Sequence, residues 1–222
     1  MAAAKRPGRF ITFEGGEGAG KSTQIRLLAA TLRASGLEAL MTREPGGSLG
    51  AEAIRELVLN RPDLAFDPLA EALLFAASRA DHVRKVIQPA LGRGSFVLCD
   101  RFADSSIAYQ GAGTELPLDV VTALRAIAVG SCEPDLTIIL DLDPAAGAAR
   151  IRARDGAGGA DRFEAESLAF HQRVRAAFLK IAADNPLRCA VIDASLPPDQ
   201  IAGRVLQELQ ARLKLSLKFN TA

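Results

Sequence analysis

Residues 15–22 read Gly15-Gly16-Glu17-Gly18-Ala19-Gly20-Lys21-Ser22, and this stretch constrains the fold more than any other part of the chain. It matches G-x-x-x-x-G-K-[ST], a pattern whose glycines let the backbone wrap a phosphate with successive N–H groups pointing inward. The preceding run, 10–14, has the length of a buried strand, and 23–32 has the composition of a helix. This order predicts a phosphate site at a helix N-terminus.

The residues of this loop have separate expected roles. Lys21 should reach the β- and γ-phosphates of a bound nucleoside triphosphate, and Ser22 should offer its hydroxyl to Mg²⁺. The predicted nucleotide-binding set covers the whole loop and the residue after it: Gly15, Gly16, Glu17, Gly18, Ala19, Gly20, Lys21, Ser22 and Thr23.

Glu17 is unexpected in such a loop because a carboxylate repels a polyanion. Two interpretations remain open. The side chain turns outward to solvent, or it faces a neutral group of a second substrate, such as a sugar hydroxyl. In both cases the loop lacks an arginine, so an arginine that stabilises a transferred phosphoryl group must come from elsewhere in the chain.

Short apolar runs alternate with helical segments along the rest of the sequence. The apolar runs are 10–14, 39–42, 96–100, 136–142 and 190–193. The helical segments are 20–35, 48–60, 67–91, 102–110, 117–130, 143–154, 164–184 and 198–214. Such runs are typical of strands buried on both faces and joined by right-handed crossovers. We therefore expect one α/β domain over 1–222, with the P-loop NTPase fold and a five-stranded parallel sheet flanked by helices on both faces.

Composition narrows the class of protein. The chain has 222 residues, of which 49% are hydrophobic and 24% are charged, as in ordinary globular proteins. The net charge of +1 disfavours a nucleic-acid surface. Cys99, Cys132 and Cys189 are widely spaced and should be free thiols in a reducing compartment. No apolar run is long enough to span a membrane and no signal peptide is recognisable, so we expect a cytoplasmic protein.

Arginine dominates the basic residues, since 21 of the 27 are arginine. One explanation is a genome that favours arginine. The other is that some of these side chains grip phosphate bidentately, which lysine cannot do.

Asp100-Arg101-Phe102 ends the third apolar run. Ligands of an open α/β sheet bind at the carboxyl ends of the strands. Asp100 there could hold Mg²⁺ through water and Arg101 an acceptor phosphate, or the two could form a simple salt pair. The chain lacks the Asn-Lys-x-Asp element by which GTPase switches read their base, which favours a phosphotransferase.

Four motifs resemble the bacterial thymidylate kinases. They are EGGEGAGKST at 14–23, TREPGG at 42–47, LFAASR at 74–79 and DRFADSSIAYQG at 100–111, and PDLT at 134–137 and DRFE at 161–164 also fit. The similarity spans about 9–195. It implies a nucleoside monophosphate kinase fold with a small lid. It also implies transfer of phosphate from ATP to thymidine monophosphate (dTMP) with Mg²⁺, and a homodimer.

The resemblance also assigns an acceptor-binding region of about 43–110. Phe75 matches the ring that stacks on thymine, although a core aromatic is the alternative. Arg79 matches the donor to a thymine carbonyl, although it could pair with Asp81 or Glu71 at the surface. Tyr109 matches the residue that crowds the 2′ position. The full predicted set is Glu17, Arg43, Phe75, Arg79, Arg101, Ser105, Ser106, Tyr109 and Gln110.

The glycine-rich segment 155–161 is either a flexible surface loop or the crest of a lid covering about 150–163. Family members with an acidic phosphate loop carry their catalytic arginine in the lid. The resemblance places Arg154 and Arg162 on the transferred phosphoryl group and Arg150 nearer the adenine, whereas a solvated basic helix end is the alternative. The predicted catalytic set is Lys21, Arg101, Arg152, Arg154 and Arg162, and the predicted metal set is Ser22 and Asp100.

No general base is needed for this reaction, because the attacking phosphate oxygen is already ionised at neutral pH. His82 and His171 are the only histidines, and we expect both on helix faces rather than in catalysis.

Overall fold

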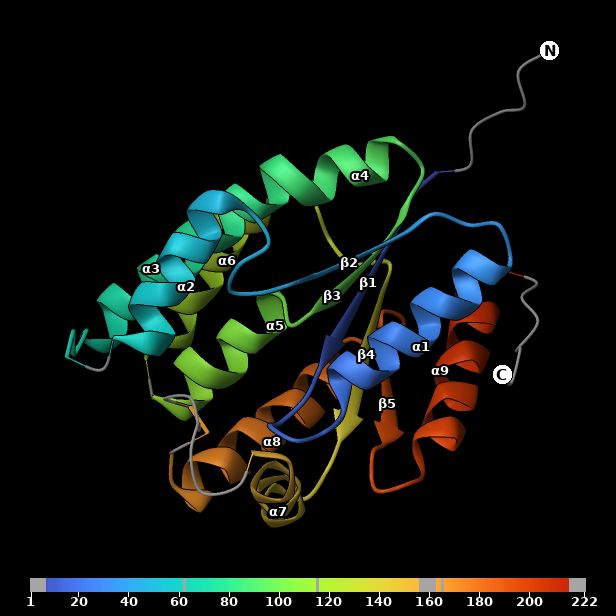
Figure 1. Ribbon diagram of the computed structural model, residues 1–222. Helices are drawn as coiled ribbons and strands as arrows, with labels where there is room; N and C mark the ends of the chain where they lie inside the picture. Colours follow the sequence, from blue (N-terminus) through green and yellow to red (C-terminus); the bar gives the residue numbers. More distant parts are fainter. Residues whose placement is uncertain (1–6, 62, 115, 156–162, 165, 216–222) are drawn as a thin grey trace.

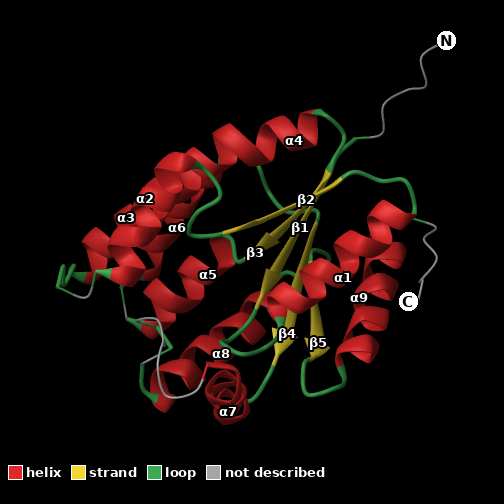
Figure 2. Ribbon diagram, in the orientation of Figure 1, coloured by secondary structure: helices red, strands yellow, loops and turns green. Residues whose placement is uncertain are grey.

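A computed structural model describes residues 7–61, 63–114, 116–155, 163–164 and 166–215, except for the side chains of Arg154 and Asp155 (Figure 1). In these ranges the chain folds around one parallel sheet with helices on both faces (Figure 2).

The sheet has five strands in the order β2-β3-β1-β4-β5, and every neighbouring pair is parallel. Their bounds are β1 Arg9–Glu14, β2 Ala39–Arg43, β3 Phe96–Asp100, β4 Leu136–Asp141 and β5 Cys189–Asp193. The predicted five-stranded parallel sheet is therefore confirmed, with strand ends shifted by one residue at most.

Burial along the strands explains why the apolar runs were recognisable. The central strands β1, β3 and β4 are buried on both faces, so their sequences are almost continuously apolar. The edge strands β2 and β5 alternate buried and more exposed residues, since less of the chain covers them. The central position of β1 places the loop that follows it in the middle of the sheet.

Helices α1 (Lys21–Ala34) and α9 (Pro198–Leu213) cover one face of the sheet, and their apolar residues pack on those of β1, β3, β4 and β5. The opposite face is covered mainly by α8 (Leu168–Asp184) and α4 (Gln88–Gly92). Beyond these, α2 (Leu49–Asn60), α3 (Pro68–His82) and α6 (Leu118–Val129) lie together on that side (Figure 1). The remaining long helix, α7 (Pro144–Asp155), follows β4.

Two of the expected helices contain π-helical segments. The segment 67–91 is continuous, but a π-helical turn, η1 (Val83–Ile87), separates α3 from α4. Pro89 has no N–H to donate to the carbonyl of Lys85 and its ring crowds that carbonyl, which disfavours a regular ladder there. Likewise α5 (Ala103–Ser106) runs into η2 (Ile107–Gly113), which carries Tyr109 and Gln110. Such insertions are frequent at functional sites.

Within the described ranges, no helix combines the length and the apolar character that crossing a membrane requires.

Candidate active site

The phosphate loop runs from the end of β1 to the start of α1, as the sequence predicted. Gly18 has φ of 69°, a left-handed conformation that favours glycine. A Cβ on Gly18 would collide with the carbonyl oxygen of Gly147 in α7, and a Cβ on Gly147 would collide with the carbonyl oxygen of Glu17. The loop and the first turn of α7 therefore touch backbone to backbone.

Lys21 is buried and lies over the loop. Its Nζ donates to the carbonyl oxygens of Gly16 at 2.9 Å and Gly15 at 3.2 Å. Burial lowers the pKa of Lys21 and the nearby Arg101 lowers it further, whereas the carboxylates around it act in the opposite direction. The ammonium group is thus already inside the loop, where a bound phosphate would meet it.

Ser22, at the start of α1, contacts Asp100, at the carboxyl end of β3: Ser22 Oγ donates to Asp100 Oδ2 at 2.7 Å. A hydroxyl and a carboxylate are oxygen donors of the kind that Mg²⁺ prefers, so this pair fits the predicted metal role. The described ranges contain no cluster of three or more His, Cys, Asp or Glu suited to a metal. A metal held by this pair would therefore need further oxygens from substrate phosphates and water.

The Asp100-Arg101-Phe102 turn has an unusual backbone. Arg101 has φ of 66°, which a residue with a side chain adopts rarely. The backbone N–H of Arg101 donates to the Phe13 carbonyl at 2.9 Å, and the next N–H, of Phe102, donates to Glu14 Oε1 at 2.8 Å. These bonds to the end of β1 hold the turn in a conformation that directs Arg101 to the phosphate loop.

Glu14 is a buried acid that the sequence interpretation left without a role. Its Oε2 also accepts a hydrogen bond from Ser105 Oγ at 2.6 Å. Burial raises the pKa of Glu14, and the nearby Asp104 raises it further, to about 8. Glu14 thus stabilises the Arg101–Phe102 turn through these hydrogen bonds, and it does not line the pocket described next.

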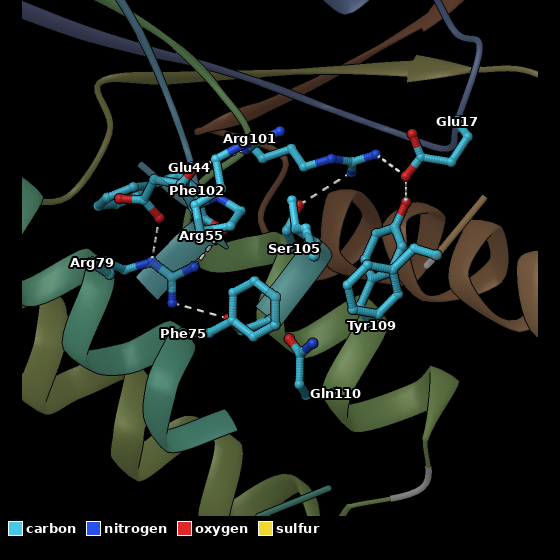
Figure 3. Close-up of a pocket in the computed structure, with 14 residues that line it drawn as sticks. Glu17, Glu44, Arg55, Phe75, Arg79, Arg101, Phe102, Ser105, Tyr109 and Gln110 are labelled. Carbon is cyan, nitrogen blue, oxygen red and sulfur yellow. Dashed lines mark hydrogen bonds and ion pairs between the residues drawn. The ribbon is translucent and has the colours of Figure 1, made fainter. Parts of the chain in front are cut away.

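Glu17 points inward, so the interpretation in which it turns out to solvent is wrong. Only 18% of its side chain is exposed; Arg101 Nη2 pairs with its Oε1, and Tyr109 donates its hydroxyl to the same oxygen at 2.9 Å (Figure 3). Burial by itself would raise the pKa of Glu17, but Arg101 and Lys21 outweigh it and lower the value to about 2. The carboxylate is therefore firmly ionised inside the site.

A pocket of about 540 Å³, the open space at its mouth included, adjoins the phosphate loop on the side of Glu17 and Arg101. The pocket brings together eight of the nine predicted acceptor residues: Glu17, Phe75, Arg79, Arg101, Ser105, Ser106, Tyr109 and Gln110 (Figure 3). Its other lining residues are Glu44, Pro45, Arg55, Leu59, Phe102 and Phe163.

One wall of the pocket is aromatic. The ring centroids of Phe75 and Phe163 are 6.0 Å apart, and those of Tyr109 and Phe163 are 5.4 Å apart with the rings nearly perpendicular. Phe75 is mostly buried in a hydrophobic cluster, as the core alternative predicts, and the same ring also lines the pocket; its stacking on thymine stays a prediction.

Arg79 also lines the pocket and is only 3% exposed. Its Nε donates to Glu44 Oε2 at 2.7 Å, Nη1 to Ser106 Oγ at 2.9 Å and Nη2 to the Phe102 carbonyl at 3.1 Å. The alternative in which Arg79 pairs with Asp81 or Glu71 at the surface is wrong. Ser106 reaches the site as predicted, and it accepts a hydrogen bond from Arg79.

Two arginines differ from what the sequence suggested. Arg43 is outside this pocket: its side chain is 53% exposed and pairs with Glu52 at 3.0 Å. Arg55, which looks in the sequence like an ordinary residue of a helix surface, lines the pocket and donates to the Pro45 carbonyl at 2.8 Å.

The expected lid is described only in part. Arg150 Nη1 donates to the Ala194 carbonyl at 3.0 Å, beside the carboxyl end of β5, and Arg152 is exposed. The side chain of Arg154 and the whole of Arg162 lie outside the described residues.

A phosphate loop at the carboxyl end of a central parallel strand, with an aromatic and arginine-lined pocket beside it, defines the class of P-loop nucleoside monophosphate kinases. Comparison with known proteins is more specific. The model of the thymidylate kinase family matches residues 13–205, which is most of the chain, and the chain belongs to that family, whose members phosphorylate dTMP to thymidine diphosphate with ATP.

Individual relatives agree with this assignment. The thymidylate kinase of Bradyrhizobium diazoefficiens is 56% identical over 206 residues, covering 93% of this chain and 90% of the relative. That of Rhodopseudomonas palustris strain TIE-1 is 55% identical over 207 residues, covering 93% and 90%. The crystal structure of thymidylate kinase from Ehrlichia chaffeensis superposes with a TM-score of 0.74 at 35% identity, covering 92% of this chain and 99% of that one. The predicted family, fold and enzyme class are confirmed.

Proposed function

We propose that the phosphate loop holds ATP, that the adjoining pocket holds dTMP, and that the γ-phosphoryl group passes in line between them. The observation that carries this proposal is the position of Arg101. Its Nη1 donates to the Gly15 carbonyl of the phosphate loop at 3.0 Å, and the same side chain lines the pocket. A phosphate of an acceptor bound by Arg101 would therefore lie next to the loop that binds the donor.

The base and sugar of the acceptor would use the inner part of the pocket. Phe75 stacks on thymine and contributes affinity through apolar contact. Arg79 donates to a thymine carbonyl, with Ser106 and Gln110 as polar neighbours. Tyr109 crowds the 2′ position and so disfavours ribonucleotides.

The acceptor phosphate would bind at the outer part, where Arg101 and Arg55 both line the pocket beside Ser105. We include Arg55 in this site because its position supports it. Arg43 remains a more distant candidate for the same phosphate. Glu17, ionised and aimed inward, is suited to accept a hydrogen bond from a sugar hydroxyl.

On the donor side, Lys21 would neutralise the β- and γ-phosphates, and the N–H groups of the loop would bind their oxygens. Ser22 and Asp100 would hold Mg²⁺, which supplies charge neutralisation and a fixed geometry for the phosphates when bound. The attacking oxygen is ionised at neutral pH, so these residues act by positioning and charge stabilisation rather than as a general base.

The remaining positive charge would come from a lid over about 150–163 in the single domain 1–222. Arg152, Arg154 and Arg162 are proposed to contact the transferred phosphoryl group, and Arg150 to lie nearer the adenine. The contact of Arg150 with the end of β5 supports its place at this edge of the sheet. Arg154→Ala should lower kcat by orders of magnitude and leave the KM for dTMP near its starting value; an unchanged kcat would assign the role to Arg152 or Arg162.

We further propose a homodimer located in the cytoplasm. Leu69 and Leu73 of α3 and Leu118 and Ile127 of α6 are exposed apolar residues on two helices that pack against each other, which supports a partner surface there. The three free, buried cysteines agree with a reducing compartment. A nucleic-acid partner is not part of the proposal, given the net charge of +1.

A panel of acceptors tests the proposed function. Release of ADP from ATP is followed with dTMP, dUMP, dCMP, dGMP and thymidine, each with and without Mg²⁺. We expect turnover with dTMP that depends on Mg²⁺, weaker turnover with dUMP, and none with thymidine, which lacks the acceptor phosphate. Turnover that favours another monophosphate, or ATP binding without any acceptor-dependent turnover, would contradict the proposal.

A further inference from the structure

A buried chain of hydrogen bonds lies behind the pocket and ends on Arg79. Thr42 Oγ1 contacts His82 Nε2 at 2.7 Å, His82 Nδ1 contacts Glu44 Oε1 at 3.0 Å, and Glu44 Oε2 accepts from Arg79 Nε at 2.7 Å. Glu44 and Arg79 line the pocket, whereas His82 does not line it and has no exposed surface. His82 therefore has no direct access to a ligand in the pocket, and any effect on that ligand must pass through its neighbours.

The direction of the chain follows from its chemistry. A carboxylate only accepts hydrogen bonds, so the proton of the His82–Glu44 bond belongs to His82 Nδ1. In the neutral ring this leaves Nε2 as an acceptor for the Thr42 hydroxyl. Both oxygens of Glu44 are then used, one by His82 and the other by Arg79. Losing the Nδ1 donor would free one oxygen of Glu44 to turn away from its present position.

The orientation of Arg79 depends on that carboxylate. Of its five N–H donors, three are directed to Glu44, Ser106 and the Phe102 carbonyl, and two others remain, one on Nη1 and one on Nη2. The bond from Nε to Glu44 fixes the plane of the guanidinium about its last torsion. A tilt of that plane would redirect the two remaining N–H groups of this side chain, which lines the pocket.

From this arrangement we infer that His82 is a positioning residue that acts through Glu44 to orient Arg79 toward the base of the acceptor. The inference rests on the proposed function, because it takes the pocket to bind a nucleoside monophosphate and Arg79 to contact its base. It adds a residue to which neither the motifs nor the lining of the pocket assigns a role.

His82 also packs against the turn that follows β2, at Gly47. A Cβ on Gly47 would collide with His82 Nε2 and would lie 2.6 Å from Thr42 Oγ1, so the turn packs directly on this contact. The same turn carries the Pro45 carbonyl that accepts from Arg55. The bond of His82 to Glu44 and its packing on the turn at Gly47 both affect the acceptor pocket, and neither involves the phosphate loop. A change at His82 should therefore alter the use of dTMP and leave the KM for ATP near its starting value.

Two substitutions separate the two ring nitrogens. In His82→Asn the amide nitrogen can take the place of Nδ1 and keep the donor to Glu44. In His82→Gln the longer side chain places its amide near Nε2, where it can keep the Thr42 contact but not the Glu44 contact. Both variants lose the ring, so we expect similar losses in Tm, which makes them matched controls for each other.

We expect His82→Gln to raise the KM for dTMP about tenfold or more with a smaller change in kcat, since a hydrogen bond to a charged group contributes roughly that much. It should also reduce the preference for dTMP over dCMP, because cytosine carries an amino group where thymine has the C4 carbonyl. His82→Asn should restore most of both quantities. Equal shifts in the two variants, or none in either, would overturn the inference.

A second measurement does not depend on the substrate. Solvent exchange of the Arg79 Nε–H, followed by NMR with ¹⁵N-labelled arginine and assigned with Arg79→Lys, reports the bond to Glu44 directly. Exchange should be at least tenfold faster in His82→Gln than in His82→Asn; equal rates would overturn the inference whatever the enzyme phosphorylates. Failure of the wild-type chain to phosphorylate dTMP would instead contradict the proposed function.

Discussion

Glu14 and Glu17 are three residues apart, one at the end of β1 and the other inside the phosphate loop, and their carboxyl groups behave in opposite ways. Glu14 is fully buried and its pKa is raised to about 8. Glu17 is also largely buried, but its pKa is lowered to about 2. Burial raises the pKa of both groups, so burial does not explain the difference.

The difference comes from what each carboxyl group contacts. Glu17 forms an ion pair with Arg101 and has Lys21 close by. Glu14 accepts from one backbone N–H and one serine hydroxyl, with Asp104 adding a like charge nearby. The two acids thus serve different purposes: Glu14 supports the turn that carries Arg101, and Glu17 is paired with the guanidinium that the turn presents.

The largest effect is expected from removing Arg101, the residue whose charge distinguishes the surroundings of Glu17 from those of Glu14. Arg101→Ala deletes the cation that pairs with Glu17 and the proposed ligand of the acceptor phosphate. We expect kcat/KM for dTMP to fall by about 10³ or more, as for the loss of a charged group that stabilises a transferred phosphoryl group. Steady-state kinetics with ATP and dTMP measure this effect.

Arg61→Ala is the matched control for Arg101→Ala, because Arg61 is exposed and its side chain pairs with Asp63, two residues away. Its kcat/KM should stay within about twofold of the wild type. A loss of less than tenfold in Arg101→Ala would contradict the central place given to this residue.

Replacing Glu14 should have the next largest effect, on stability as a function of pH. Its pKa is higher in the folded protein than the ordinary value of 4.5, so the folded state binds more protons between about pH 4.5 and 8. Wild-type stability should fall relative to Glu14→Gln as pH rises through this window. The difference is at most on the order of 5 kcal/mol, since one pKa unit corresponds to about 1.4 kcal/mol.

Urea unfolding at pH 5, 6, 7 and 8 measures this difference, with Glu38→Gln as the control because Glu38 is an exposed acid on the loop before β2. The Gln side chain at position 14 keeps an acceptor for the Phe102 N–H and can donate to Ser105. A difference in stability that does not change between pH 5 and 8 would show that Glu14 is ionised throughout.

Glu17→Gln should show the opposite dependence and a smaller size. The pKa of Glu17 is lower in the folded protein than the ordinary value, so its stabilising contribution is complete above about pH 4.5 and disappears as pH falls toward 2. The stability advantage of the wild type should be at most on the order of 3 kcal/mol near neutral pH. It should shrink between pH 5 and 3 in urea titrations; an advantage that grows toward acid pH would contradict the ion pair with Arg101.

The sheet and the phosphate loop could be predicted from local sequence patterns alone. The runs at β1, β3 and β4 are apolar throughout because these strands are buried on both faces, and Gly18, Lys21 and Ser22 lie in a pattern whose spacing is fixed by backbone geometry. The acceptor residues from Phe75 to Gln110 required more than local pattern, since they come from α3, the turn after β3, α5 and η2. Only the resemblance to a family brought them together.

The residues that sequence analysis missed depend on pairs far apart in the chain. Glu44 and His82 read as a turn residue and a helix residue, and their contact forms only when α3 packs against the end of β2. Arg43 ends β2 just before the Pro45 turn and Arg55 lies within α2 after it, and the direction of each side chain decides which one enters the pocket. Glu14 precedes the loop and reads as part of a strand, although its partners lie about 90 positions later.

The contact between Gly18 and Gly147 has a consequence for how this chain can evolve. Gly147 lies outside every recognisable motif, yet any side chain there would push the first turn of α7 off the phosphate loop. A change at one glycine cannot be compensated at the other, because Gly18 faces the Gly147 carbonyl and Gly147 faces the Glu17 carbonyl, and neither neighbour is a side chain that could shrink. Substitutions at either position should therefore be poorly tolerated. In a scan of all single substitutions, position 147 should accept as few residue types as position 18.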